Sequence, residues 1–111
     1  MPYVRVITET KPANCSPSFR WVLPDTYIAS HRKKYYEDVG LILSSTFSFK
    51  DSNNQICSAN TSNMRLLTST FANQESYLKW MNDPIRKIFS SEKTKYYESY
   101  KIERNITYND I

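Results

Sequence analysis

The stretch FANQESYLKWMNDP, residues 71–84, carries the clearest structural signal in the sequence. It completes a strand-like run from Met64 to Phe71. Asn73 is a suitable helix N-cap, because its side-chain oxygen can accept a hydrogen bond from an N–H group of the first turn. Glu75 places a negative charge in that turn, where the helix dipole favours it. Apolar side chains then recur at helical spacing and predict an amphipathic helix: Tyr77, Trp80 and Met81.

A second helix signal follows at Asp83-Pro84. Asp83 is a suitable cap, and Pro84 takes the first helical position, where its missing N–H donor costs nothing. The apolar stripe continues at helical spacing with Ile85, Ile88 and Phe89. The stretch therefore predicts a strand, a tight turn and a kinked amphipathic helix whose apolar stripe ends near Ser90.

The remaining sequence predicts three more strands and one more helix. The strands are expected from alternation and β-branched residues at Tyr3–Glu9, Leu41–Phe49 and Tyr97–Thr107. Between them, prolines make Pro12–Pro24 a loop, and a helix runs from a cap at Asp25 to Asp38, with Gly40 suited to the left-handed position that ends it. The inward stripe of this helix is expected to be Tyr27, Ile28, His31, Tyr35 and Val39.

Strict alternation also assigns the two faces of each strand. In the first strand, Tyr3, Arg5 and Ile7 share one face, and Val4, Val6 and Thr8 share the other. In the second, one face comprises Leu41, Leu43, Ser45, Phe47 and Phe49, and the other comprises Ile42, Ser44, Thr46 and Ser48.

The order β-α-β-β-α-β predicts an α+β, ferredoxin-like domain spanning residues 1–111, in which a four-stranded antiparallel sheet has two helices on one face. Apolar residues fall on both faces of the first and third strands, although the predicted helices can cover only one face of the sheet. A second copy is the expected cover for the other face. We therefore expect a homodimer that pairs through the sheet face.

Composition excludes several classes of protein. The 111 residues carry a net charge of +4, which indicates weak attraction to anions and is too small to predict nucleic-acid binding. One glycine rules out Gly-rich phosphate loops, and Cys15 and Cys57 match no metal spacing. No signal peptide or run of about 20 apolar residues is seen, so we expect a cytoplasmic protein with no membrane contact, no metal and no cofactor.

Taken with this element order, residues 71–84 resemble the dimeric α+β barrel superfamily, which includes the antibiotic-biosynthesis-type monooxygenases. In that group the third strand often ends in an aromatic residue, followed by a cap, an acidic residue, an aromatic residue and tryptophan. The matching residues here are Phe71, Asn73, Glu75, Tyr77 and Trp80. The local match covers some fifteen to twenty residues. The resemblance implies a pocket between helices and sheet for a hydrophobic small molecule.

The haem-degrading branch of this superfamily is similar in having a tryptophan where Trp80 stands. That branch also has a haem-ligating histidine about three helical turns later, where this chain has Ser90, and an asparagine on the first strand, where it has Ile7. With both partners missing, the resemblance does not extend to haem degradation. The cofactor-free oxygenases of the group share no invariant triad, so residue matching does not test them.

Five residues are candidates for ligand contact: Arg5, Tyr27, His31, Tyr35 and Trp80. His31 is the one histidine in the chain and the one candidate for a catalytic residue, because imidazole exchanges protons near neutral pH. The alternative interpretation, a core or rim histidine bonded to a tyrosine hydroxyl or a carbonyl, is the commoner one for a single histidine on an inward stripe. Arg5 either reaches solvent from a strand edge, pairs with a protein carboxylate such as Glu9 or Glu103, or binds the carboxylate of a ligand.

Three functions remain open at this point. The first is binding of an elongated apolar molecule with a polar or carboxylate head, such as a fatty-acyl or polyketide-like compound. The second is a cofactor-independent monooxygenase of the antibiotic-biosynthesis type. The third is a structural or partner-binding module without a ligand. The RNA-recognition motif shares the element order, but Met64–Phe71 has no glycine and one aromatic residue, so nucleic acid is not an expected partner.

Overall fold

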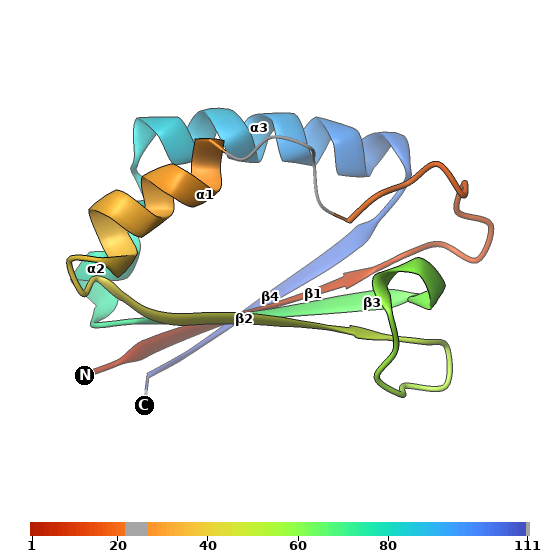
Figure 1. Cartoon of the computed structure of the whole chain (residues 1–111), viewed down its shortest axis with the longest axis horizontal. Coiled ribbons are helices and arrows are strands. Elements are labelled where there is room, and N and C mark those ends of the chain that lie inside the picture. The colour runs from red at the N-terminus through yellow and green to blue at the C-terminus, as the bar shows by residue number, and fades with distance from the viewer. Residues whose placement is uncertain (22–26, 111) are drawn as a thin grey trace.

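The computed structural model describes residues 1–21 and 27–110 and confirms the predicted ferredoxin-like α+β fold. The helices lie together on one side of a four-stranded antiparallel sheet (Figure 1). The strands are β1 (Tyr3–Thr10), β2 (Ile42–Lys50), β3 (Met64–Phe71) and β4 (Glu103–Asp110). The helices are α1 (Tyr27–Arg32), a π-helical turn η1 (Lys33–Glu37), a 3-10 turn η2 (Ala59–Thr61), α2 (Gln74–Met81) and α3 (Pro84–Ser99).

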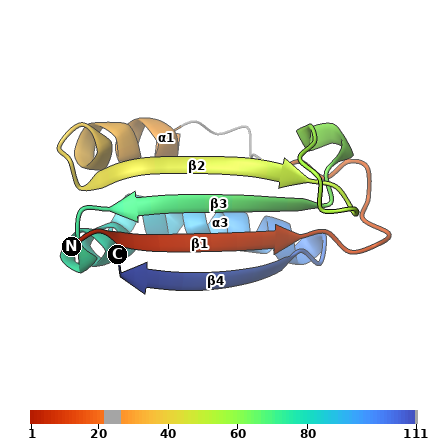
Figure 2. The same ribbon diagram turned by 90° about the horizontal axis from the view of Figure 1, so that it is seen from below.

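The strand order in the sheet is β2-β3-β1-β4, so β1 and β3 are central (Figure 2). In the antiparallel register Tyr3 lies opposite Phe71 and Glu9 lies opposite Arg65. Directly opposed residues share a face. We call the helix-covered side the inner face; it carries Tyr3, Arg5, Ile7 and Glu9 on β1. The other side, seen uncovered in Figure 2, is the outer face and carries Val4, Val6, Thr8 and Thr10.

The capping signals are confirmed atom by atom. The Asn73 side chain accepts a hydrogen bond from the Ser76 N–H at 2.8 Å, and Asp83 Oδ1 accepts from the N–H groups of the first turn of α3. Pro84 is the first residue of α3, and Gly40 adopts φ +79°, the left-handed conformation that ends the first helical segment. The predicted start of that segment, at Asp25, lies outside the described residues.

A π-helical turn changes which tyrosine of the first helical segment enters the core. In η1 the Asp38 N–H donates to the Lys33 carbonyl at 2.8 Å, which fits one extra residue into the turn. Tyr36 is therefore buried, at 2% exposure, whereas Tyr35 is 50% exposed. Val39 is exposed as well. The predicted stripe, which placed Tyr35 and Val39 inward at constant helical period, was wrong beyond His31.

A β-bulge makes a similar correction in the second strand. Ile42 lies opposite Phe71 and Ser44 opposite Thr70, so Leu43 is the extra residue between them. Ile42 thus faces inward and is buried, while Leu43 is exposed. The alternation predicted for this strand holds from Ser44 onward but is wrong at its start.

The last helix is longer than predicted. It continues to Ser99, and β4 begins only at Glu103. Tyr97, assigned to a strand from the alternation, is instead a buried helical residue that packs against Phe19 and Trp21. β4 continues to Asp110, where a frayed tail was expected.

Two clusters of buried side chains form the core on the inner side of the sheet. The first gathers under α1 and α2: Tyr36, Ile42, Phe71, Tyr77 and Trp80. The second lies where the β1–α1 loop meets the end of α3: Phe19, Trp21 and Tyr97. Between them, several cations and one carboxylate occupy the inner side.

Candidate functional site

Arg5 lies on the inner face of a central strand, so it does not reach solvent from an edge. Its Nη1 lies 3.2 Å from the Met81 sulfur at the end of α2, and its Nε is inaccessible to solvent and has no hydrogen-bond partner. It forms no ion pair with any carboxylate whose side chain the structure describes. Neither Glu9 nor Glu103, the partners considered from sequence, satisfies it.

A second guanidinium, that of Arg86, converges on the same residue of α2. Its Nη1 donates to the Met81 carbonyl at 3.0 Å. Burial is the main cause that lowers the pKa of Arg5, and the charge of Arg86 lowers it further. Beside them Tyr77 donates to the Tyr108 hydroxyl at 3.1 Å, and burial together with that bond raises the pKa of Tyr77 to about 12. Two guanidiniums and two neutral phenols thus share one partly desolvated region.

Farther along β1, three cations surround the fully buried carboxylate of Glu9. Arg65 Nε donates to Glu9 Oε1 at 2.9 Å, across the β1–β3 register. Arg104 Nε and Lys93 Nζ lie 3.1 and 3.5 Å from Oε2. Burial is the largest cause that lowers the pKa of Lys93 to about 8, with Glu9 opposing the shift and Arg65 adding to it.

The inner side therefore carries a surplus of positive charge. Its cations are Arg5, Arg65, Arg86, Lys93 and Arg104. Among the side chains that the structure describes, that of Glu9 is the one carboxylate that pairs with any of them. Asp83, which pairs with His31, is a second carboxylate near Arg86, so five cations face two carboxylates on this side. Because an unpaired buried charge is unfavourable, this arrangement favours an anionic occupant.

His31 is held by Asp83, not by a tyrosine or a carbonyl. Its Nε2 lies 2.8 Å from Asp83 Oδ2, which also accepts the Tyr36 hydroxyl at 2.6 Å. Burial opposes ionisation of Asp83, but hydrogen bonds from Tyr36, His31 and the Arg86 N–H outweigh it and lower the pKa of Asp83 to about 2. One carboxylate thus caps α3 with one oxygen and orients the histidine with the other.

The remaining candidates fall into different environments. Trp80 is buried, with its ring 4.7 Å from that of Tyr36, so it is a core residue. Tyr35 is half exposed and its ring lies 5.0 Å from that of His31. The side chain of Tyr27 is outside the described part of the structure. Of the five predicted residues, His31 and Tyr35 are in contact, while Arg5 belongs to the cationic region.

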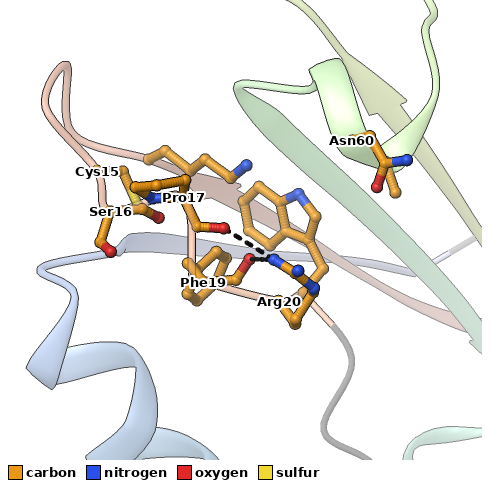
Figure 3. Close-up of a pocket in the computed structure, with 9 residues that line it drawn as sticks. Cys15, Ser16, Pro17, Phe19, Arg20 and Asn60 are labelled. Carbon is orange, nitrogen blue, oxygen red and sulfur yellow. Dashed lines mark hydrogen bonds between the residues drawn. The ribbon is translucent and has the colours of Figure 1, made fainter.

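A pocket of about 320 Å³ (Figure 3) is formed at the end of the sheet that lies away from α2 (Figure 1). It is formed by the β1–α1 loop and η2, and its lining includes Lys11, Cys15, Phe19, Arg20, Trp21 and Asn60. A neighbouring pocket shares Cys15 and Ser16 with it. Arg5, His31, Tyr35 and Trp80 line neither pocket. Cys15 and Cys57 are both free thiols.

Comparison with known proteins was made at the level of families, curated sequences and structures. No family model matches the chain, and no curated protein matches it. A solved structure from Deinococcus radiodurans, named as a candidate antibiotic biosynthesis monooxygenase, superposes with a TM-score of 0.62 over 98% of this chain and 91% of that one, at 14% identity. The likeness is one of fold. It confirms the architecture expected from the resemblance of residues 71–84.

A second similar structure is a dimeric ferredoxin-like protein from an uncultured marine organism, with 8% identity and a TM-score of 0.45 over 100% of this chain and 96% of that one.

Within residues 1–21 and 27–110, no three histidine, cysteine or acidic side chains are grouped closely enough to hold a metal ion. No helix in the same ranges is long and apolar enough to cross a bilayer.

Several residues of the cationic region were not found from sequence. Lys93, Arg65 and Arg104 are not among the candidates predicted from the sequence. Each of them is a charged side chain on the apolar face of its strand or helix. Among the sequence predictions, this criterion was applied to Arg5 alone. Asp83 was recognised as a cap, but its second role depends on α1, 52 residues earlier.

Proposed function

We propose that this protein binds an elongated apolar molecule with an anionic head, such as a long-chain carboxylate, between the sheet and α3. The observation that carries the proposal is Arg5: a guanidinium on the inner face of a central strand, without a carboxylate partner among the described side chains. Arg86, beside it, also has no carboxylate partner for its guanidinium among the described side chains, and in the bonds given above that guanidinium donates only to the Met81 carbonyl. A ligand carboxylate would provide the bidentate partner that both guanidiniums lack.

Apolar side chains left exposed on the inner face supply a surface for the rest of such a ligand. Phe47 points inward from β2 yet is 63% exposed, and Ile106 and Tyr108 on β4 are also exposed. Ile106 and Tyr108 lie on the strand next to Arg5, with Tyr108 directly opposite it. An amphiphile with its head at Arg5 that lies against these two side chains would remove apolar surface from water and compensate a buried charge together.

The test compares palmitate with hexadecanol, which has the same chain length and lacks the carboxylate. Native mass spectrometry and calorimetry should show palmitate binding, with hexadecanol binding much more weakly. Arg5→Met should weaken palmitate binding by about tenfold to a hundredfold, because a charge-assisted hydrogen bond is lost. Arg32→Met, at a partly exposed helical arginine away from Arg5, is the matched control and should bind as the wild type does. Absence of palmitate uptake, or equal affinity in Arg5→Met, would contradict the proposal.

Stability separates loss of contact from loss of fold in this experiment. Replacing a desolvated, unpaired charge by an apolar side chain of similar length is neutral or stabilising. We therefore expect Arg5→Met to unfold at the same urea concentration as the wild type or a higher one. A variant that binds less and is no less stable identifies Arg5 as a ligand contact.

The outer face supports the homodimer that we propose alongside. Its central strands present Val4, Val6, Thr8 and Thr10 beside Met64, Leu66, Thr68 and Thr70, with no charged side chain among them. Four strands of about eight residues cover roughly 26 Å by 19 Å, so two such faces bury on the order of 1,000 Å². That lies at the lower limit of specific interfaces.

A dimer of this size should dissociate in the micromolar range unless the loops add to it. Sedimentation velocity should show a concentration-dependent dimer that Leu66→Glu, on the outer face, converts to a monomer. Leu78→Glu, at an exposed position of α2, should leave the dimer intact. A monomer at all concentrations, or dissociation by both variants alike, would contradict pairing through the outer face.

A second candidate function is cofactor-independent oxygenation, favoured by the His31–Asp83 contact of 2.8 Å. A carboxylate that holds one ring nitrogen orients the imidazole as a base. In this reaction His31 would remove a proton from an activated CH₂ group of a phenolic or enolic substrate, and the resulting carbanion would reduce dioxygen. The carbon becomes a carbonyl and the second oxygen atom leaves as water, so no external reductant is required.

Oxygen uptake with anthrone tests this candidate. The wild type should consume one dioxygen per anthrone oxidised, above the spontaneous rate. His31→Phe should abolish the enhancement, and Asp83→Asn should reduce it while keeping the α3 cap. A rate unchanged in His31→Phe would exclude the histidine as the base.

A further inference from the structure

The pocket formed by the β1–α1 loop and η2 (Figure 3) is lined by positive and by aromatic side chains. Two cations, Lys11 and Arg20, line it together with the Asn60 amide, and no acidic side chain does. Neither cation forms an ion pair with a carboxylate in the described part of the chain. Two uncompensated charges in one concave site create a positive potential that attracts anions.

Contacts with the pocket walls place both cations. Lys11 Nζ lies 5.3 Å from the ring centre of Trp21 and 5.6 Å from that of Phe19, so it rests over two aromatic faces. Arg20 Nη1 donates to the carbonyl groups of Pro17 and Phe19 at 2.9 and 3.0 Å, as Figure 3 shows. These bonds occupy one nitrogen of the guanidinium and orient the rest of it.

The walls themselves are fixed to the body of the protein. Trp21 Nε1 donates to the Ser62 hydroxyl at 2.7 Å, and the Tyr97 hydroxyl donates to the Trp21 carbonyl at 2.9 Å. The Arg20 N–H donates to the Tyr96 hydroxyl at 2.9 Å. A loop held by these three bonds needs little ordering when a ligand arrives, which favours binding.

We propose that this pocket binds a small organic anion, a phosphate or carboxylate carried on a compact planar group. The oxyanion would lie between Lys11 and Arg20 with Asn60 as a further donor, and its planar carbon skeleton would contact Phe19 and Trp21. A volume of about 320 Å³ is at the lower end for ligand sites, so the ligand is small. Lys11 directly follows β1 and lies six positions after Arg5, roughly 20 Å along an extended chain, so this site is distinct from that of the long-chain ligand.

The two tryptophans make a direct test possible. Their indole N–H groups give two NMR signals, assigned with Trp80→Phe, and only Trp21 lies at the pocket. Phenyl phosphate, benzoate, inorganic phosphate and uncharged benzyl alcohol are titrated at constant ionic strength. We expect phenyl phosphate or benzoate to shift the Trp21 signal saturably and to leave the Trp80 signal in place. Saturation by inorganic phosphate with equal affinity would show that the planar group is not recognised and would overturn that part of the proposal.

Variants of Lys11 and Arg20 then test whether these two cations bind the anion. Lys11→Gln and Arg20→Gln should each weaken binding about tenfold to a hundredfold, and Lys11→Arg should retain it. Lys34→Gln is the matched control, because Lys34 Nζ also lies over a ring, 5.2 Å from that of Tyr35, but far from the pocket. No saturable shift, equal binding of benzyl alcohol, or unchanged affinity in Lys11→Gln would overturn the proposal. Palmitate binding is measured separately and does not affect this outcome.

Discussion

Replacing Glu9 with glutamine removes one charge and hardly changes the shape of the side chain. The carboxylate is fully buried, and Arg65, Arg104 and Lys93 all lie within 3.5 Å of it. In the Glu9→Gln variant these three cations would lose the one carboxylate that the structure places among them. The glutamine would also turn an NH₂ group toward at least one cation.

The expected cost follows from burial. Removing one partner of a buried ion pair typically costs about 3–5 kcal/mol, because the remaining charge stays desolvated without compensation. Arg65 is itself almost completely buried, so this case belongs to that class. Against a total stability of about 5–15 kcal/mol for a domain of this size, we expect Glu9→Gln to lose at least about a fifth of the free energy of unfolding.

Urea unfolding followed by tryptophan fluorescence measures this loss. Glu37→Gln is the control, because it breaks the partly exposed Arg32–Glu37 pair and should cost less than about 1 kcal/mol. The double variant Glu9→Gln/Lys93→Met should recover part of the loss by removing one unpaired cation. Equal losses in Glu9→Gln and Glu37→Gln, or no recovery in the double variant, would refute charge compensation by Glu9.

Three further outcomes are expected from single sites. Burial lowers the pKa of Lys93 to about 8 in the folded protein, from an ordinary value of 10.5. Between these values the unfolded chain binds more protons, so the free energy of unfolding should rise with pH. Denaturation at pH 7.5 and 9.5 should show a rise that Lys93→Met lacks. Trp80→Ala should cost about 3–5 kcal/mol and Tyr35→Ala less than about 1, and equal costs would return Tyr35 to the core. Gly40→Ala should cost about 1 kcal/mol through its φ of +79° alone, since an added Cβ meets nothing within 4 Å; an unchanged melting temperature would contradict this.

Local signals along the chain were sufficient for the most accurate part of the prediction. The strand Met64–Phe71 has the predicted bounds, and the caps at Asn73 and Asp83 are made by the predicted side chains. Capping depends on residues within three or four positions of one another, so the sequence contains the whole interaction. The ferredoxin-like order followed because each element was recognised separately.

Periodicity failed where one residue was inserted into a regular element. The π-helical turn at Lys33–Glu37 exchanges Tyr35 for Tyr36, and the bulge at Leu43 brings Ile42 inward. Each shift moves every later residue on one side of the irregularity to another face. No residue type marks either position, because the fit of Tyr36 against Trp80 and Asp83 involves a helix more than 40 residues away.

The charged interior was within reach of sequence reasoning in part. Once Tyr3–Glu9 and Met64–Phe71 are taken as adjacent antiparallel strands with aligned ends, Glu9 falls opposite Arg65, and a buried cross-strand ion pair follows. Lys93 and Arg104 require more, because their approach to Glu9 depends on how far α3 continues over the sheet. α3 continues to Ser99, with Tyr97 buried in the second core cluster and the Lys93 ammonium 3.5 Å from Glu9 one turn earlier. The apolar stripe that predicted this helix ends near Ser90, so nothing in the pattern predicted that Lys93 would lie beside a buried carboxylate.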